Sequence, residues 1–327
     1  MVKILITGGA GFIGSHLSEA LFALGHEITV LDNCTSGSKQ NLSLILDKIR
    51  MVNGDIQDEK LVETLVCKSD LIFHLAAAVG VKKILEYPIE SISTNIFGSK
   101  VVLNSAAKYN KRIIIASSSE IYGKNPNQPL SESDERYIGS PQRIRWSYSD
   151  SKAIEEAIAS FLNISKNLPV TTVRIFNTVG PRQIGQYGMV IPRFVSSALN
   201  DLPLKIYGDG TQSRVFCHIS DTVDALIKLA QTDNSIGQVL NLGGENEIEI
   251  KNLAHLTIQI TNSNSQTLFV PYEEAYSFGF EDMKRRVPDI SKIMSVIDWK
   301  PIKGIEDIIR DIVQAYKITG LLPSSRF

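Results

Sequence analysis

The feature that most constrains the fold of this chain is a glycine-rich turn directly after its first apolar strand. Residues 3–7 read KILIT, and the segment TGGAGFIG begins at the last of them. Gly8, Gly11 and Gly14 have the spacing GxxGxxG, which permits a tight turn, lets a pyrophosphate approach the backbone and allows a helix to pack closely on a sheet. The helix that follows offers free N–H groups to phosphate. The turn therefore predicts a dinucleotide-binding site.

An acidic residue follows this turn at the spacing expected for NAD. Asp32 ends the second apolar strand, 18 residues after Gly14, where a carboxylate accepts hydrogen bonds from the ribose diol and repels a 2′-phosphate. No Arg follows Asp32 directly, which favours NAD over NADP. A purely structural glycine turn is the alternative, and the order of strand, turn, helix and acid speaks against it. Further candidate cofactor contacts, the last two of which fit an ordinary turn equally well, are Phe12, Ile13, Asn33, Asp55 and Ile56.

Apolar strands alternate with helical periodicity over the first half of the chain, which predicts an α/β fold with a Rossmann-type, doubly wound parallel sheet. After Asn177 prolines and glycines weaken the rhythm. We expect a Rossmann domain over residues 1–177, to which 205–245 returns, and a smaller C-terminal α/β domain formed mainly by 178–327. The expected strands are 3–7, 27–31, 49–52, 71–75, 112–116, 170–176 and 239–242, and the expected helices are 11–24, 58–67, 95–109, 148–166 and 221–231.

Composition excludes several classes of protein. The chain has 34 Lys+Arg against 35 Asp+Glu, so no basic field for nucleic acid or an anionic membrane is expected. Its three cysteines are far apart and its five histidines form no HxxxH spacing, so neither a disulfide framework nor a metal site is indicated. No targeting segment and no apolar run long enough to span a bilayer stands out. The sequence therefore predicts a cytoplasmic protein without a nucleic-acid or membrane partner.

A second constellation of residues can carry proton chemistry. Tyr148 and Lys152 are four residues apart at the start of an expected helix, so they share one face. A lysine ammonium favours the phenolate and lowers a tyrosine pKa that is otherwise about 10, which lets tyrosine accept a proton from an alcohol. Ser118, Ser119 and Glu120 follow the fifth strand, at the edge where open α/β sheets place their sites. The alternative for these three is a polar loop capped by serines.

These motifs together resemble the extended short-chain dehydrogenase/reductase family. The resemblance is carried by TGGAGFIG, Asp32, HLAAA at 74–78, SSSEIYG at 117–123, YxxxK and FNTVGPR at 176–182, and it covers nearly the whole chain. It implies an NAD-dependent epimerase, dehydratase or decarboxylase of nucleotide sugars, a UDP-sugar as the favoured substrate, and a homodimer. Ser118 would be the active-site hydroxyl, Tyr148 the base and Lys152 its partner. By the same resemblance the further cofactor contacts would be Leu75, Ala76, Ala77 and Asn95, and the substrate contacts Asn177, Arg193, Tyr207, Arg214 and Arg286.

Three outcomes remain open within this family, because one scaffold supports all of them. Oxidation at C4 makes a β-keto acid if C5 bears a carboxylate, and that acid can lose CO₂; otherwise water can be expelled or the ketone reduced from its other face. The segment GFEDMKRRVPDI at 279–290 and Ser119-Glu120 are similar to UDP-glucuronate decarboxylase types, and Arg286 would hold the carboxylate. We therefore favour decarboxylation, then 4-epimerisation, then 4,6-dehydration. Outside this class stand a net NAD-dependent dehydrogenase and a non-catalytic NAD sensor, which would be expected to lose Tyr148 or Lys152.

Overall fold

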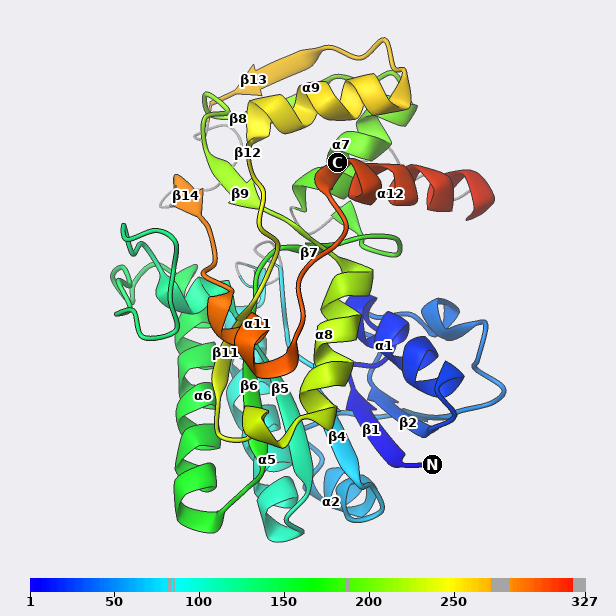
Figure 1. Ribbon diagram of the computed structural model, residues 1–327, viewed down its shortest axis with the longest axis vertical. Coiled ribbons are helices and arrows are strands. Elements are labelled where there is room, and N and C mark those ends of the chain that lie inside the picture. Colours follow the sequence, from blue (N-terminus) through cyan, green and yellow to red (C-terminus); the bar gives the residue numbers. More distant parts are fainter. Residues whose placement is uncertain (81–83, 85, 186–188, 272–282, 320–327) are drawn as a thin grey trace.

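Seven parallel strands form one sheet in the order β11-β6-β5-β4-β1-β2-β3, which confirms the expected α/β doubly wound architecture (Figure 1). The computed structural model describes residues 1–80, 84, 86–185, 189–271 and 283–319. The strands of this sheet are β1 (Lys3–Thr7), β2 (Glu27–Asp32), β3 (Arg50–Asn53), β4 (Leu71–His74), β5 (Arg112–Ser118), β6 (Val170–Ile175) and β11 (Val239–Leu242).

Helices cover both faces of the sheet, because successive side chains of its buried strands point to opposite sides. Ile4 and Ile6 pack toward the helices of one face, whereas Leu5 packs toward those of the other. The first face carries α1 (Phe12–Ala23), α8 (Ile219–Gln231) and α11 (Ser291–Ile297), and the second carries α2 (Glu59–Cys67), α5 (Ser99–Lys108) and α6 (Trp146–Lys166). Short helical turns connect them: η1 (Lys39–Leu42), η3 (Ser119–Tyr122) and η5 (Asp233–Ser235).

The helix expected over 95–109 is the second part of a longer helical run. The run begins with α4 (Pro88–Ser93), passes through the π-helical turn η2 (Thr94–Gly98) and continues as α5. Pro88 occupies the first turn of α4, where its missing N–H costs no hydrogen bond. The other expected elements of the first half agree with the structure to within a few residues at their ends.

A third hydrophobic cluster holds the upper part of the molecule together, and we call the elements around it the upper lobe. The lobe contains α7 (Val190–Leu199), β8 (Leu204–Tyr207), β9 (Ser213–Val215), β12 (Glu247–Glu249), α9 (Ile250–Thr261), β13 (Thr267–Val270), β14 (Arg285–Arg286) and α12 (Ile305–Thr319). The prolines and glycines of this part of the sequence predicted irregular structure, but it contains three regular helices, α7, α9 and α12, within the described residues. A parallel pair, β7 (Thr178–Val179) and β10 (Cys217–His218), lies between the lobe and the sheet.

The segment 205–245, expected to return to the sheet, divides between the two parts of the molecule. Its strand β11 pairs in parallel with β6, and α8 packs on the sheet. The first part of the segment does not return to the sheet as expected, because β8 pairs with β13 and β9 pairs with β12 and β14. The apolar side chains of β8, such as Leu204 and Ile206, belong to the core of the upper lobe, which explains the pairing.

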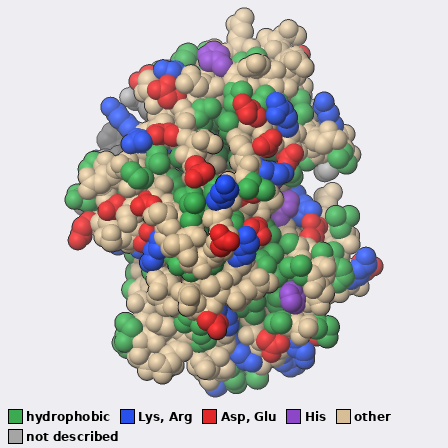
Figure 2. Space-filling view, in the orientation of Figure 1, with side chains coloured by type: hydrophobic (Ala, Val, Ile, Leu, Met, Phe, Trp, Pro, Cys, Tyr) green, Lys and Arg blue, Asp and Glu red, His purple; other side chains and the backbone are tan. Residues whose placement is uncertain are grey.

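The outer surface carries charges of both signs. Lys and Arg side chains lie among Asp and Glu side chains on the face shown in Figure 2. Within the described part of the chain, no helix combines the length and the apolar character that crossing a bilayer requires.

Candidate active site

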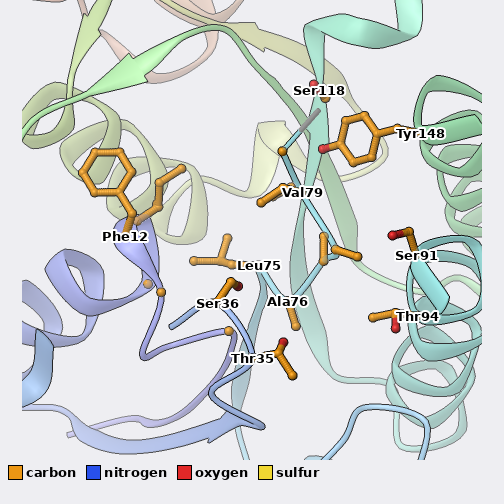
Figure 3. Close-up of a pocket in the computed structure, with 18 of the residues that line it drawn as sticks. Phe12, Thr35, Ser36, Leu75, Ala76, Val79, Ser91, Thr94, Ser118 and Tyr148 are labelled. Atoms are coloured by element: carbon orange, nitrogen blue, oxygen red, sulfur yellow. The ribbon is translucent and has the colours of Figure 1, made fainter. Parts of the chain in front are cut away.

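A cavity of about 1000 Å³ opens at the carboxyl ends of the sheet strands, where β1 has β2 on one side and β4 on the other (Figure 3). Such an edge is where open parallel sheets bind their ligands. Most residues predicted from the sequence line this cavity. They are Gly8, Gly11, Phe12, Ile13, Gly14, Asp32, Asn33, Asp55, Ile56, Leu75, Ala76, Ala77, Ser118, Ser119, Glu120, Tyr148, Lys152, Asn177 and Arg286.

The glycine turn leaves room for a ligand against bare backbone. Gly8 has a φ of +72°, which L side chains rarely adopt, and a Cβ there would lie 2.7 Å from the backbone nitrogen of Ala76. A Cβ on Gly14 would clash with the carbonyl oxygen of Gly8, so close packing of α1 on the turn requires glycine. The amino end of α1 therefore opens onto the cavity, as a pyrophosphate needs.

Asp32 ties this turn to the end of β2. Its Oδ2 accepts a hydrogen bond from the backbone nitrogen of Ala10 at 2.9 Å, and its Oδ1 accepts one from that of Cys34 at 2.8 Å. The carboxylate still lines the cavity, and each of its oxygens has lone-pair capacity for a ribose hydroxyl. Asn33 donates to Asp55 at 2.9 Å and so links the ends of β2 and β3 along the same wall. These residues fit a dinucleotide with a free ribose diol.

Replacing Gly14 by Ala is expected to destabilise the protein by about 1–3 kcal/mol, because the new methyl group overpacks the turn. The thermal midpoint falls, and added NAD raises it by less than in the unmodified protein. Differential scanning calorimetry with and without NAD measures both effects. Gly25→Ala is the matched control for added side-chain volume, since no neighbouring atom lies within 4 Å of a Cβ there. Because Gly25 has a positive φ, any loss of stability in this variant comes from the backbone. The rise of its thermal midpoint on adding NAD stays that of the unmodified protein.

Tyr148 projects from the first turn of α6 into the cavity, beside Ser118 at the end of β5 (Figure 3). Burial raises the pKa of Tyr148, whereas the Ser118 hydroxyl lowers it. Lys152 lies one turn further along α6 and is almost completely buried. Its Nζ donates to the carbonyl oxygen of Ala116 and to Glu155 Oε2, each at 2.7 Å. The predicted hydroxyl, base and lysine thus come together at one wall of the cavity.

The carboxylate of Glu120 is held between two arginines. Arg286 Nη1 lies 2.7 Å from Glu120 Oε1, and Arg145 Nη2 lies 3.5 Å from Oε2. Burial disfavours the charged form of Glu120, but the charges of Arg286 and Arg145 outweigh it and lower its pKa to about 2. At neutral pH Glu120 is therefore a carboxylate in the ligand-free protein. The Nε of Arg286 is buried and has no hydrogen-bond partner among the described residues.

Arg286 reaches the cavity from the upper lobe through a fixed strand. Leu130 donates its backbone N–H to Val287 O at 2.8 Å and accepts one from Asp289 N at 2.8 Å. Gln128 Oε1 accepts the N–H of Val287 at 2.8 Å. β14 is thereby fastened to a loop that follows β5. Of the predicted segment 279–290, residues 279–282 lie outside the described part of the chain.

Four predicted residues do not line the cavity. Asn95 binds both backbone polar groups of Ala78 and so supports the loop after β4; its expected contact with the cofactor stays a prediction. Arg193 stacks on the Tyr207 ring, 4.3 Å from its centroid, away from the cavity. Arg214 pairs in register with Arg286, donates to Ser213 O at 2.7 Å, and adds positive charge near Glu120.

Two residues at this site were missed in the sequence. Arg145 precedes Tyr148 by three residues and Glu155 follows Lys152 by three, so helical spacing from the known pair would have found both. Within the described residues no cluster of His, Cys, Asp and Glu could hold a metal ion.

A parallel sheet with a glycine turn, an acid after β2 and a Tyr–Lys pair beside a serine defines an extended short-chain dehydrogenase/reductase. A family model described as GDP-mannose 4,6 dehydratase matches residues 5–312, and the chain belongs to this family of nucleotide-sugar epimerases, dehydratases and decarboxylases. The resemblance seen in the sequence is thereby confirmed.

Several known proteins are similar to the chain over nearly its whole length. A UDP-N-acetyl-alpha-D-glucosaminuronate decarboxylase of Bacillus cytotoxicus is 40% identical over 96% of this chain and 98% of its own. UDP-glucuronic acid decarboxylase 1 of Xenopus tropicalis is 32% identical over 96% of this chain and 72% of its own. Among solved structures, UDP-glucuronic acid 4-epimerase of Bacillus cereus, in complex with UDP-glucuronic acid and NAD, superposes with a TM-score of 0.86 at 25% identity, over 97% and 99% of the two chains.

Proposed function

We propose that this protein is an NAD-dependent decarboxylase of a UDP-linked hexuronic acid. The observation that carries the proposal is the position of Arg286, whose guanidinium lies at Glu120, in the same cavity as Tyr148 and Ser118. A cation pair built from Arg286 and Arg145 suits a substrate that carries a carboxylate next to its reacting carbon. The relatives named as decarboxylases of UDP-glucuronic acid and of its N-acetylglucosamine counterpart support this choice.

The residues present fit NAD as the cofactor. Gly8, Gly11 and Gly14 would bind its pyrophosphate, Asp32 its adenosine ribose, and Lys152 the ribose next to the nicotinamide. When bound, NAD supplies a hydride acceptor for C4 of the sugar and later returns the hydride. We further propose that residues 1–177 form most of the NAD-binding domain and 178–327 mainly the substrate-binding domain.

The protein side chains supply the proton transfers and the anion clamp. Tyr148 accepts the proton of the C4 hydroxyl during oxidation, with Ser118 hydrogen-bonded to the same oxygen and Lys152 favouring the phenolate. The resulting 4-keto sugar is a β-keto acid, so the bond between C5 and its carboxylate breaks and CO₂ leaves. Its electron pair passes to the C4 oxygen as an enolate, which takes a proton at C5 from water. Reduction at C4, with the proton of Tyr148 returned to the oxygen, completes the turnover.

Glu120 and the substrate carboxylate compete for one guanidinium. Because Glu120 is a carboxylate already bound to Arg286, a uronate can bind only if Arg286 shares or exchanges its partner. Arg286 lines the cavity, which gives a substrate carboxylate access to it. We infer that Arg286 orients the substrate carboxylate, while Glu120 keeps Arg286 extended into the cavity before substrate arrives.

The test is to incubate the purified protein with NAD and either UDP-glucuronate or UDP-N-acetylglucosaminuronate, and to follow the products by mass spectrometry and proton NMR. A product lighter by CO₂ supports the proposal and identifies the sugar. An isobaric product with an inverted C4 proton signal would instead make the protein a 4-epimerase. In a parallel incubation with UDP-glucose, loss of water would make the protein a dehydratase. NADH accumulating with turnover in any of these incubations would make it a net dehydrogenase.

We propose that the protein is a cytoplasmic homodimer in which α6 forms part of the interface. Ile154, Phe161 and Ile164 of α6 are exposed, with Phe161 at 67%, and Phe97 of η2 is exposed as well. Phe161→Glu is expected to shift the protein from dimer to monomer, because a carboxylate buried at an interface has no partner. Size-exclusion chromatography with light scattering measures the change, and Ile302→Glu, exposed outside α6, is the control that stays dimeric.

A further inference from the structure

A buried carboxylate lies directly behind the Tyr148–Lys152 pair and takes no part in the steps above. Glu155 is fully buried in α6, one helical turn after Lys152, so the two side chains share a helix face. Its Oε2 accepts a hydrogen bond from Lys152 Nζ at 2.7 Å, and Nζ also donates to Ala116 O. An ammonium has three N–H donors, so one remains for the cavity that Lys152 lines.

The groups that face Glu155 from neighbouring elements do not neutralise it. His74 Nε2 of β4 lies 3.9 Å from Glu155 Oε1. The same imidazole is hydrogen-bonded to Thr7 Oγ1 at 2.7 Å and to Ser99 Oγ at 2.9 Å. Burial, followed by the charge of Lys152, lowers the pKa of His74 to about 3, so this ring is neutral in the physiological range. Lys152 is therefore the one charged partner of Glu155 among the described residues.

The next residue along α6 shows that Glu155 is not needed to fasten the helix. Glu156 makes a bidentate ion pair with Arg174 of β6, with Arg174 Nη2 at 2.8 Å from Glu156 Oε2. That pair already ties α6 to the sheet. Glu155 points instead toward the active site, and burying a second acid beside it is costly unless the acid serves Lys152.

The electrostatic effect of Glu155 on Tyr148 opposes that of Lys152. Burial raises the pKa of Tyr148. Lys152 and the hydroxyl of Ser118 lower that pKa, and the negative charges of Glu155 and Glu120 raise it. Burial likewise disfavours the charge of Lys152, but Glu155 overcomes this and raises the pKa of Lys152. Burial raises the pKa of Glu155 itself, and Lys152 opposes that rise. In its charged form Glu155 keeps Lys152 charged while weakening its field at the phenol.

We propose that Glu155 is a positioning residue of this active site: it anchors the Lys152 ammonium and offsets part of its charge, so that Lys152 favours the Tyr148 phenolate less than an unpaired lysine would. The role of Tyr148 as base is taken from the proposed function. The ion pair between Glu155 and Lys152 then fixes the pH range in which Tyr148 accepts a proton, although Glu155 itself does not line the cavity.

The experiment is a titration of Tyr148 without substrate. Tyrosinate absorbance is followed against pH, and the curve of the same protein carrying Tyr148→Phe is subtracted, which removes the other nine of the ten tyrosines. In Glu155→Gln the hydrogen-bond acceptor remains but the charge is lost. The midpoint of Tyr148 is then expected about one pH unit or more below that of the unmodified protein. In the presence of substrate, the acid limb of kcat moves to lower pH by a similar amount, because activity requires Tyr148 to lose its proton.

Glu156→Gln is the matched control, since it removes an adjacent buried carboxylate whose hydrogen-bonded partner is Arg174. It lowers the thermal midpoint and leaves the Tyr148 titration close to that of the unmodified protein. An equal titration shift in Glu155→Gln and Glu156→Gln, or no shift in Glu155→Gln, would overturn the proposal. If Glu155→Gln does not fold, Glu155→Asp replaces it: its carboxylate lies farther from Nζ, and an unmoved midpoint there has the same meaning.

The titration and the substrate assay fail independently. A shifted Tyr148 midpoint in a protein that transforms no uronate would leave the role of Glu155 standing and reject the proposed substrate. Decarboxylation of the uronate with an unshifted Tyr148 midpoint would support the proposed substrate and reject the role of Glu155.

Discussion

Replacing Tyr148 by Phe is expected to lower kcat by about 10²–10⁴-fold with little change in KM, because the variant keeps the ring but loses the group that exchanges a proton with the C4 oxygen. The phenol projects from α6 into the cavity beside Ser118. Steady-state decarboxylation kinetics measure the loss, and calorimetry with NAD shows whether cofactor binding is retained. Retained binding places the defect in chemistry.

Tyr122→Phe is the matched control for this prediction. Tyr122 belongs to the same SSSEIYG segment but is fully buried, and its hydroxyl donates to Asn241 Oδ1 at 2.6 Å and accepts from Arg174 Nη1 at 3.0 Å. Its loss is expected to reduce the free energy of unfolding by about 1 kcal/mol or more and to leave kcat nearly unchanged. A kcat loss in Tyr122→Phe as large as that in Tyr148→Phe would show that the effect comes from disturbed packing at the end of β5.

Replacing Arg286 by Ala is expected to lower kcat/KM for a UDP-hexuronate by about 30-fold or more, since removing one partner of a buried charge pair costs about 2–5 kcal/mol. Two losses combine in this variant. The substrate carboxylate loses its guanidinium, and Glu120 loses the cation 2.7 Å from its Oε1. The pKa of Glu120 accordingly rises from about 2 toward its ordinary range. Kinetics with the uronate substrate and binding of UDP by calorimetry measure the two parts of the effect.

Arg285→Ala is the control that the chain itself offers. Arg285 is the neighbouring residue of β14, is half exposed, and pairs at the surface with Glu247. Exposed pairs contribute about 0–1 kcal/mol, so its kcat/KM stays within about fivefold of the unmodified value. If Arg286→Ala weakened UDP binding as much as it lowered uronate turnover, Arg286 would be a general contact of the nucleotide, and its role as the carboxylate clamp would be rejected.

The parts of this site that could be predicted from sequence are those whose residues are close along the chain. The glycine turn, Asp32 and the Tyr148–Lys152 pair each lie within one turn, one strand end or one helical turn, so their spacing reports their geometry. The alternation of apolar strands and helices likewise predicted the sheet. Tertiary pairing decided the rest. The switch of β8 and β9 to the upper lobe depends on strands that follow some thirty to seventy residues later along the chain.

Arg193 and Tyr207 show that a resemblance of short segments does not predict where side chains lie. Both were expected to contact substrate because their segments resemble those of the family, but in the structure they stack on one another outside the cavity lining. Their role in substrate binding stays a prediction. The ion pairs of Glu120 join residues from η3, the start of α6 and β14, and no pattern in the sequence states that these three meet.

The arrangement of Arg286 has a consequence for how such enzymes diversify. The proton-transfer residues stand on the large sheet and α6, whereas the guanidinium that would select a carboxylated sugar stands on the two-residue strand β14 of the upper lobe. Arg286 is therefore encoded far from the proton-transfer residues, whereas Arg145, the other cation at Glu120, is encoded three residues before Tyr148. A duplicated copy could change its sugar by substitutions around β14, with its oxidation machinery inherited intact. Decarboxylases, epimerases and dehydratases sharing one ancestor would be expected to differ most in this strand and least in the glycine turn.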